Sequence, residues 1–286
     1  MHVSVMPGEA IALLAIRPDG VYLDATCGMG GHTALIAERL TTGVVIANDR
    51  DGESLEMARQ RLADFGTRVR FHHGTFGTLN EAVREAGFEK LDGILADLGV
   101  SRYQLTEPGR GFSFQADGPL DMRMDQTTGT TAADLVNYSN ETTLADLIYQ
   151  FGEERRARKL ARAIVRARPI RSTLHLADVV LRAVPRTGRL HPATKTFMAL
   201  RMAVNDETGQ LDRLLQIGPG LLKSGGRMVV ISFMSLDDRK VKEKFKALGR
   251  DGLVKVLTKH PLQPSEEEAS LNPASRSAKL RALERI

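Results

Sequence analysis

The sequence predicts an α/β fold with a mainly parallel sheet and an inserted all-helical domain. Over the first hundred residues, short apolar runs alternate with helical patterns, the order expected of parallel strands joined by right-handed helical crossovers. Helical patterns without strands follow, and a strand pattern returns only near residue 227. We therefore expect residues 1–105 and 207–286 to form one domain, and residues 106–206 to form the inserted helical domain.

Four apolar runs of the first domain are predicted to be strands. They are Val21–Ala25, Val44–Asn48, Val69–His72 and Leu91–Asp97. Between them, Gly52–Phe65 and Leu79–Ala86 carry apolar residues at helical spacing. Ligands of such a sheet bind at the carboxyl ends of its strands, so we expect the functional site there.

The pattern changes after Leu98. Gly99–Gly129 is rich in Gly, Pro, Asp and Arg and shows no sustained period, which predicts a functional loop. Helices are then predicted at Thr142–Phe151, Glu153–Arg168, Leu174–Val184 and Ala193–Glu207. A turn at Ser224–Gly226, a surface loop at Pro264–Ser275 and three further strands complete the prediction, the strands being Arg227–Phe233, Leu253–Leu257 and Ala278–Leu283.

Composition excludes several classes of protein. The 286 residues are 42% hydrophobic and 26% charged, as in an ordinary globular protein, and no apolar run approaches the ~18 residues of a membrane span. The N-terminus lacks the basic start of a signal peptide, so we expect a cytoplasmic protein. Cys27 is the single cysteine, and we expect it to fill space in a turn rather than to act as a nucleophile. Because there is no Cys/His cluster, no metal site is predicted.

The net charge of +5 is unevenly distributed. Residues 106–206 contain 15 Lys/Arg against 11 Asp/Glu, so they carry +4 of the total. Four of these cations share one face of the predicted helix that begins at Glu153, namely Arg155, Lys159, Arg162 and Arg166. A basic stripe of this kind is typical of contact with a nucleic-acid backbone, and the alternative is a plain solvated face.

The glycine-rich segment Asp24–Thr33 lies between the first predicted strand and a helical pattern. Gly28 precedes Asp49 by 21 positions, close to the ~20 at which an acidic residue meets the ribose hydroxyls of a bound nucleoside. A dinucleotide fingerprint would need glycine at position 33, where this chain has Thr33, and Asp24 would repel a pyrophosphate but suit a cation. The pattern therefore favours S-adenosylmethionine, whose sulfonium is cationic, over a simple tight turn.

Asp97 follows the fourth predicted strand, where it would face the reactive end of the cofactor. A carboxylate there can accept a hydrogen bond from an amine and later help its proton to leave, so Asp97 is our candidate catalytic residue. The alternative is that Asp97 only caps a turn. In the following loop, Arg110, Phe112 and Phe114 suit stacking of an unpaired base, although core packing explains the two aromatic residues equally well.

Together these motifs resemble the bacterial 16S ribosomal RNA cytosine-N4-methyltransferases, and the likeness spans nearly the whole chain. The most specific string is RGFSFQADGPLDMRMD at Arg110–Asp125. The other matching segments are Asp24–Thr33, Asp49–Asp51, His73–Phe76, Asp97–Ser101, His191–Glu207, Gly225–Arg239 and Asn272–Arg281. The resemblance implies a Rossmann-like methyltransferase domain and an inserted helical domain that recognises the RNA substrate.

Carried over by position, the family's cofactor-binding residues fall on Gly30, Gly31, His32, Asp49, Phe76, Asp97 and Gln104. The resemblance implies that Asp49 lies at the ribose and that Phe76 lies beside the adenine. It also implies that the modified cytosine belongs to the decoding region of the small ribosomal subunit. The chain departs from the family at Arg102-Tyr103, where Ser-Pro is usual, and at Met234, where histidine is usual, so we assign no role to position 234.

We therefore expect an enzyme that transfers a methyl group from S-adenosylmethionine to N4 of a cytidine in 16S ribosomal RNA, with no metal and no membrane partner. One alternative is a non-catalytic RNA-binding protein that keeps a vestigial cofactor pocket, and another is a methyltransferase that acts on DNA or protein. The intact segment Asp24–His32 and the following Asp49 argue against the non-catalytic alternative.

Overall fold

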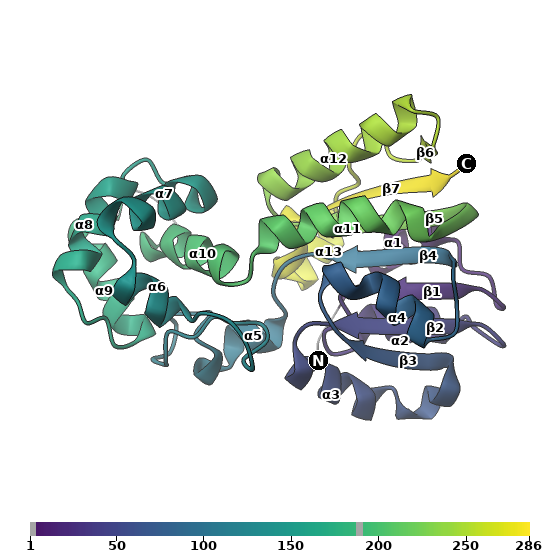
Figure 1. Cartoon of the computed structure of the whole chain (residues 1–286), viewed down its shortest axis with the longest axis horizontal. Helices are drawn as coiled ribbons and strands as arrows, with labels where there is room; N and C mark the ends of the chain where they lie inside the picture. The colour runs from purple at the N-terminus through teal and green to yellow at the C-terminus, as the bar shows by residue number, and fades with distance from the viewer. Residues whose placement is uncertain (1–3, 187–190) are drawn as a thin grey trace. The chain divides into compact units, whose positions relative to one another are not determined.

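The computed structural model describes residues 4–186 and 191–286, which form two compact units (Figure 1). The first unit comprises Met1–Gly99 and Thr208–Ile286, and the second comprises Val100–Glu207. Each unit has its own hydrophobic core, as is typical of a protein domain.

The first unit is built on one seven-stranded sheet with the order β3-β2-β1-β4-β5-β7-β6. Its strands are β1 (Val21–Asp24), β2 (Val44–Asp49), β3 (Val69–His73), β4 (Leu91–Asp97), β5 (Leu222–Ser232), β6 (Val254–Val256) and β7 (Lys279–Arg285). Strands β1 to β5 pair in parallel, whereas β7 runs antiparallel to both β5 and β6. The predicted α/β fold with a mainly parallel sheet is therefore confirmed.

Helices cover both faces of this sheet. On one face lie α1 (Pro7–Leu14), α2 (Gly31–Ala37) and α3 (Gly52–Arg61), and on the other lie α4 (Leu79–Glu85), α11 (Glu207–Leu221) and α12 (Ser235–Arg250). Successive strand residues enter opposite cores, since Tyr22 packs with the first group and Leu23 with the second. Both faces being covered explains why the first strands are continuous apolar runs. Two short 3-10 helices, η1 (Ala63–Arg68) and η2 (Phe76–Thr78), lie between the first strands of the sheet.

The second unit has helices, loops and no strand in its described residues. It contains α5 (Arg102–Thr106), η3 (Pro108–Arg110), α6 (Ala132–Tyr138), α7 (Glu141–Gly152), α8 (Ala157–Arg166), α9 (Thr173–Ala183) and α10 (Ala193–Val204). Its core is lined by side chains such as Leu144, Ile148, Leu160 and Leu176, which are each 1% exposed or less. The apolar face of α8 points into this core, as the sequence pattern predicts, and its cations remain outside.

Two predicted helix boundaries are wrong because single residues adopt left-handed backbone. The helix predicted from Glu153 begins only at Ala157, since Glu153 caps the end of α7 with φ 47°. The helix predicted for Ala193–Glu207 ends at Val204, and α11 begins after Asp206, which also has φ 47°. Left-handed non-glycine residues are uncommon, so such breaks are not visible in an apolar period.

Two further predictions near the C-terminus are corrected. The predicted surface loop Pro264–Ser275 contains α13 (Glu266–Leu271) and part of η4 (Pro273–Ser277). Ser265 caps α13 by accepting the Glu268 N–H at 3.1 Å, and the acidic first turn complements the helix dipole. The predicted turn Ser224–Gly226 lies inside β5, where the pairing with β4 shifts register and Gly225 has φ 77°.

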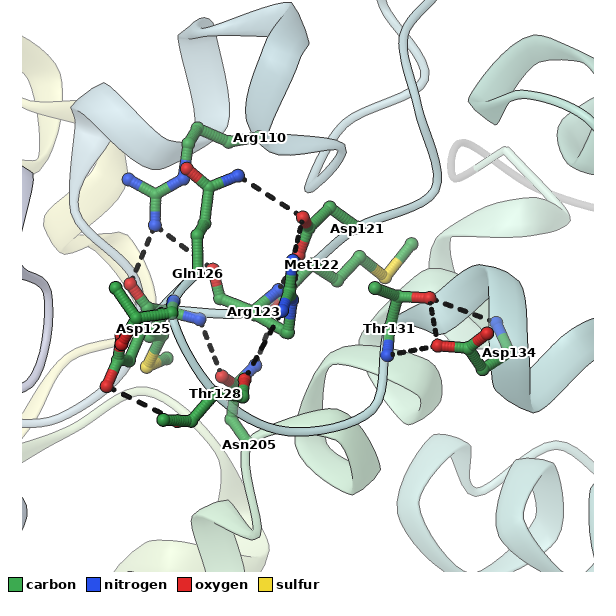
Figure 2. A network of polar contacts seen from close by, with 12 residues as sticks. Arg110, Asp121, Met122, Arg123, Asp125, Gln126, Thr128, Thr131, Asp134 and Asn205 are labelled. Atoms are coloured by element: carbon green, nitrogen blue, oxygen red, sulfur yellow. Dashed lines mark hydrogen bonds and ion pairs between the residues drawn. The ribbon is translucent and has the colours of Figure 1, made fainter.

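The segment predicted as a functional loop, Gly99–Gly129, is held by buried polar contacts (Figure 2). The Arg110 guanidinium donates to the carbonyls of Arg123 and Met124 at 3.0 and 2.8 Å. The two aromatic residues of this segment, which the sequence left undecided, belong to the core. Phe112 is 6% exposed, and Phe114 packs edge-on against Phe197 with ring centroids 4.8 Å apart.

Candidate functional site

The glycine-rich segment forms a tight turn between β1 and α2. Gly28 and Gly30 have φ values of 52° and 82°, a region that side chains rarely adopt. A Cβ at Gly30 would lie 2.7 Å from Cδ1 of Leu62, so this glycine allows close packing against α3. A Cβ at Gly28 would meet no protein atom within 4 Å. Gly28 therefore presents bare backbone to open space at the carboxyl end of β1.

Asp49, the last residue of β2, holds this turn. Its Oδ2 accepts the Gly28 N–H at 2.6 Å, and its Oδ1 accepts the Asp51 N–H at 2.8 Å. The spacing of 21 residues noted in the sequence thus becomes a direct contact. Burial raises the pKa of Asp49 to about 6, against the opposing effect of these two hydrogen bonds.

Thr33 explains why the dinucleotide pattern is broken. Its hydroxyl, which is fully buried, donates to Oδ2 of Asp24 at 2.7 Å, while the Thr26 N–H donates to the other carboxylate oxygen at 3.1 Å. Asp24 is 1% exposed, and burial raises its pKa. A carboxylate maintained at this place opposes the binding of a pyrophosphate and favours a cation.

Asp97 ends β4 beside the same turn. Its backbone N–H donates to the Thr26 hydroxyl at 2.7 Å, which ties the end of β4 to the glycine-rich segment. Its Oδ1 is buried and has no hydrogen-bond partner in the structure. Burial raises the pKa of Asp97 to about 6, His32 lowers it, and Asp24 raises it further. An unpaired buried carboxylate oxygen is costly, so its retention points to a ligand group that supplies the missing donor.

His32, in the first turn of α2, is committed to contacts within the protein. Its Nε2 lies 3.0 Å from the carbonyl oxygen of Val5, and because a carbonyl only accepts, this nitrogen carries the proton. Its Nδ1 then faces Asp97, 3.8 Å from Oδ2. The side chain is 5% exposed. The group of His32 that is left for a ligand carboxylate is therefore its backbone N–H, which has no acceptor within the helix.

Phe76 follows β3 and begins η2. Its ring is half-buried against the core of the first unit, and its backbone N–H donates to Oε1 of Gln210 at 3.1 Å. Gln210 belongs to α11 and is 8% exposed. Sequence reasoning missed Gln210, because no motif joins residues 134 positions apart. Gln210 fixes the backbone at the residue that the family resemblance places beside the adenine.

Three other residues that the sequence singled out are Gln104, Met234 and Cys27. Gln104 belongs to the second unit, where it is 4% exposed and forms a capping box with Ser101 at the start of α5. Met234 precedes α12 as its N-cap and contributes no side-chain cap. Cys27 is buried and free, and burial raises its thiol pKa well above the ordinary value, in agreement with a space-filling role.

The first unit thus brings together the turn at Gly30 and Gly31, His32, Asp49 and Asp97. They lie at the carboxyl ends of three neighbouring strands, β2, β1 and β4 (Figure 1). Asp24 raises the pKa of both Asp49 and Asp97, so three carboxylates at this edge act on one another. A bound cation would relieve that repulsion, and the residues present therefore fit a ligand with a sulfonium and an ammonium group.

Residues 4–186 and 191–286 contain no group of three or more His, Cys, Asp or Glu that could hold a metal ion. Within the same residues, no helix is both long enough and apolar enough to cross a membrane.

Comparison with known proteins identifies the family of this chain. The model of the MraW methylase family matches residues 1–286. A relative from Solibacter usitatus, named ribosomal RNA small subunit methyltransferase H, is 77% identical over 284 residues, covering 99% of each chain. A relative of the same name from Acidobacterium capsulatum is 51% identical, covering 99% of this chain and 98% of its own.

A crystal structure of a Clostridium thermocellum protein assigned as an rRNA methylase covers all of both chains with a TM-score of 0.50. At 14% identity, this likeness shows the fold alone. The full-length family match and the 77% identical relative go further: the chain belongs to the MraW methylase family and is an S-adenosylmethionine-dependent methyltransferase.

Proposed function

We propose that this enzyme methylates N4 of a cytidine in the decoding region of 16S ribosomal RNA. The names of its relatives support ribosomal RNA of the small subunit as the substrate. One observation supports an amine as the group that receives the methyl: Oδ1 of Asp97, at the carboxyl end of β4, is buried and has no hydrogen-bond partner. Such a substrate also places the enzyme in the bacterial cytoplasm.

The cofactor is proposed to bind at the carboxyl ends of β1, β2 and β4. When bound, it supplies an electrophilic methyl group on a sulfonium. The backbone N–H groups of Gly31 and His32 would hold its carboxylate, and Gly30, whose own N–H donates to the Cys27 carbonyl at 2.8 Å, would shape the turn beside it. Asp49 would accept from the ribose hydroxyls with the lone pairs that Gly28 and Asp51 leave free. Phe76 would contact the adenine, and Gln104 would complete the set.

Asp97 is proposed to orient the amine and to take its proton. The lone pair of a cytosine amine is delocalised into the ring, so the reaction needs that nitrogen held in line with the methyl group. Oδ1 of Asp97 can accept one N–H of the amine and receive this proton as the new N–C bond forms. The hydrogen bond from Nε2 of His32 to the Val5 carbonyl keeps Nδ1 facing Asp97, and His32 lowers the pKa of Asp97 against the effect of burial.

The helical domain, residues 106–206, is proposed to recognise the RNA. Its support is the exposed basic face of α8, where Arg158, Lys159 and Arg166 project from a helix whose other face is buried. Arg155, which the sequence placed on the same helical face, is exposed but lies in the turn before α8. Arg162 shares this face and pairs with Glu141 at 3.3 Å. The decoding region is a phosphate-rich target for such a surface.

Methyl transfer from labelled S-adenosylmethionine tests the proposal. The purified chain would be given naked 16S ribosomal RNA, assembled small subunits, DNA and total protein in separate reactions, and labelled nucleosides would be identified by mass spectrometry after digestion. We expect N4-methylcytidine from 16S ribosomal RNA in one of the first two reactions. Label in DNA or protein, or no label with folded enzyme, would refute the proposed acceptor.

Gly28→Ala is expected to weaken cofactor binding more than it weakens the fold. The left-handed backbone costs an alanine about 1–2 kcal/mol, and the new methyl would point into the space assigned to the cofactor. Gly252→Ala is the matched control, because Gly252 has φ 69° and equally open surroundings but lies after α12. Calorimetry with S-adenosylhomocysteine should show a loss of affinity of about tenfold or more only for Gly28→Ala. Equal affinities of the two variants would contradict the assignment.

Removing the basic face of α8 is expected to flatten the salt dependence of RNA binding. Serine at the four stripe positions should reduce the slope of log K against log salt by about 3, because each phosphate contact to a single strand contributes about 0.7. The control replaces four exposed cations of the first unit by serine, namely Lys242, Lys246, Arg250 and Lys255. Equal slopes for the two quadruple variants would mean that the stripe, Arg155, Lys159, Arg162 and Arg166, is only a solvated face.

A further inference from the structure

Tyr138 is the most exposed of the large apolar side chains in the described residues. It is the last residue of α6, and 83% of its surface is accessible. Its neighbour Val136 is fully buried in the core of the second unit, so the helix is anchored while the tyrosine ring projects from it. Contact of this ring surface with water is unfavourable in free energy, and a partner that covers the ring would remove that contact.

The backbone that carries Tyr138 is clamped from a second segment. The Arg168 guanidinium donates to the carbonyl oxygens of Val136 and Ser139, which lie on either side of the tyrosine. Asn137 and Ile170 exchange two hydrogen bonds, of 3.0 and 2.8 Å, between the amide side chain and the backbone. The ring is therefore presented from a rigid turn, which lowers the entropic cost of binding a partner on it.

Two further cations flank the clamp in the sequence. The clamp residues Arg168 and Ile170 lie between Arg166 and Arg171, whose side chains are both exposed. The nearby acidic groups are already engaged, since Glu141 pairs with Arg162 and Asp134 accepts the hydroxyl of Thr131 at 2.6 Å. An exposed aromatic ring among arginines is the arrangement with which proteins stack an unpaired base and neutralise its phosphates.

We propose that Tyr138 is a stacking platform for an unpaired base of the RNA substrate, with Arg166 and Arg171 contacting the adjoining phosphates. The inference rests on the proposed RNA substrate and adds a contact to it. The platform is distinct from the segment with Phe112 and Phe114, whose rings are used in the core. It selects single-stranded over paired RNA, because a base inside a duplex cannot stack on a side chain.

A tryptophan at this position tests the inference directly, since the chain contains no tryptophan. Tyr138→Trp keeps an aromatic surface and provides a single tryptophan, whose fluorescence can be excited selectively. Tyr149→Trp provides the control at another exposed tyrosine, on α7. A ten-nucleotide single-stranded RNA should quench the fluorescence of Tyr138→Trp, whereas a duplex RNA of equal length should not. The control should respond to neither. Quenching that is equal in both variants, or absent from Tyr138→Trp when RNA is bound, would overturn the proposal.

Affinity and kinetics give the second measurement. Tyr138→Ala should weaken binding of 16S ribosomal RNA by about 5- to 150-fold and raise its KM without lowering kcat, and Tyr138→Phe should restore most of the affinity. Unchanged thermal unfolding would show that the fold is intact. If wild-type enzyme fails to methylate the RNA, the proposed function fails. If the wild-type enzyme methylates the RNA and Tyr138→Ala binds the RNA with the same affinity, only the stacking platform is refuted.

Discussion

Asp97→Asn is expected to slow methyl transfer by about 100- to 10,000-fold, the range of a lost general base. The same change should raise the free energy of unfolding near pH 8 by up to about 3 kcal/mol, because it removes a buried carboxylate whose Oδ1 has no partner. Single-turnover kinetics with saturating S-adenosylmethionine and urea unfolding would measure the two effects. A residue that serves only to cap a turn would show neither the large rate loss nor the gain in stability.

The pH dependence supplies the control for this prediction. The pKa of Asp97 in the fold is about 6, above its ordinary 3.8, so ionisation of this group lowers the stability of the fold as pH rises from 3.8 to about 6. The stability difference between the variant and the wild type should therefore vanish below about pH 3 and be complete above about pH 7. The wild-type rate should fall as pH drops below about 6, because a protonated Asp97 cannot take the amine proton. A rate independent of pH between 5 and 8, with chemistry rate-limiting, would contradict the assigned role.

Asn205→Leu is expected to lower the free energy of unfolding by about 2–6 kcal/mol, since at least two buried backbone groups lose their partners. Asn205 is 1% exposed; its amide donates to the carbonyl of Met122 at 2.7 Å and accepts the Met124 N–H at 2.8 Å (Figure 2). Met122 itself has left-handed backbone, with φ 61°, which these bonds help to maintain. Urea unfolding would measure the loss, and hydrogen exchange would locate it in residues 110–126.

Two further variants make the Asn205 prediction specific. Asn205→Asp keeps the oxygen that accepts from Met124 but loses the donors, so it should fall between the wild type and the leucine variant. Asn80→Leu changes an exposed asparagine of α4 and should cost less than about 0.5 kcal/mol. Loss of protection spread evenly over both units would show that Asn205 does not act locally. Asn205→Leu should also abolish methylation of RNA, while cofactor binding by the first unit remains.

The strands and the three carboxylates could be predicted from the sequence for one physical reason. Strands covered on both faces must be continuously apolar, so the first polar residue at each end is conspicuous. Asp24 and Asp97 are such residues, Asp49 follows the polar Asn48 at the end of β2, and the order of a parallel sheet brings its carboxyl ends to one edge. The spacing from Gly28 to Asp49 had a physical cause, which is the hydrogen bond between them.

Other features depend on contacts that no local pattern encodes. Gln210 meets Phe76 across 134 residues, and the clamp on Tyr138 comes from a segment 30 residues later. The breaks at Glu153 and Asp206 depend on left-handed backbone in residues that usually avoid it. The aromatic residues Phe112 and Phe114 could suit either a core or a base, and only the surrounding helices decide for the core.

Mass mapping of 16S ribosomal RNA from cells that lack the gene tests the central claim most directly. We expect that one N4-methylated cytidine of the decoding region loses this methyl group in the deletion strain. A plasmid encoding the wild-type chain should restore it, and one encoding Asp97→Asn at equal protein level should not. An unchanged methylation pattern in the deletion strain, or full restoration by Asp97→Asn, would contradict the account.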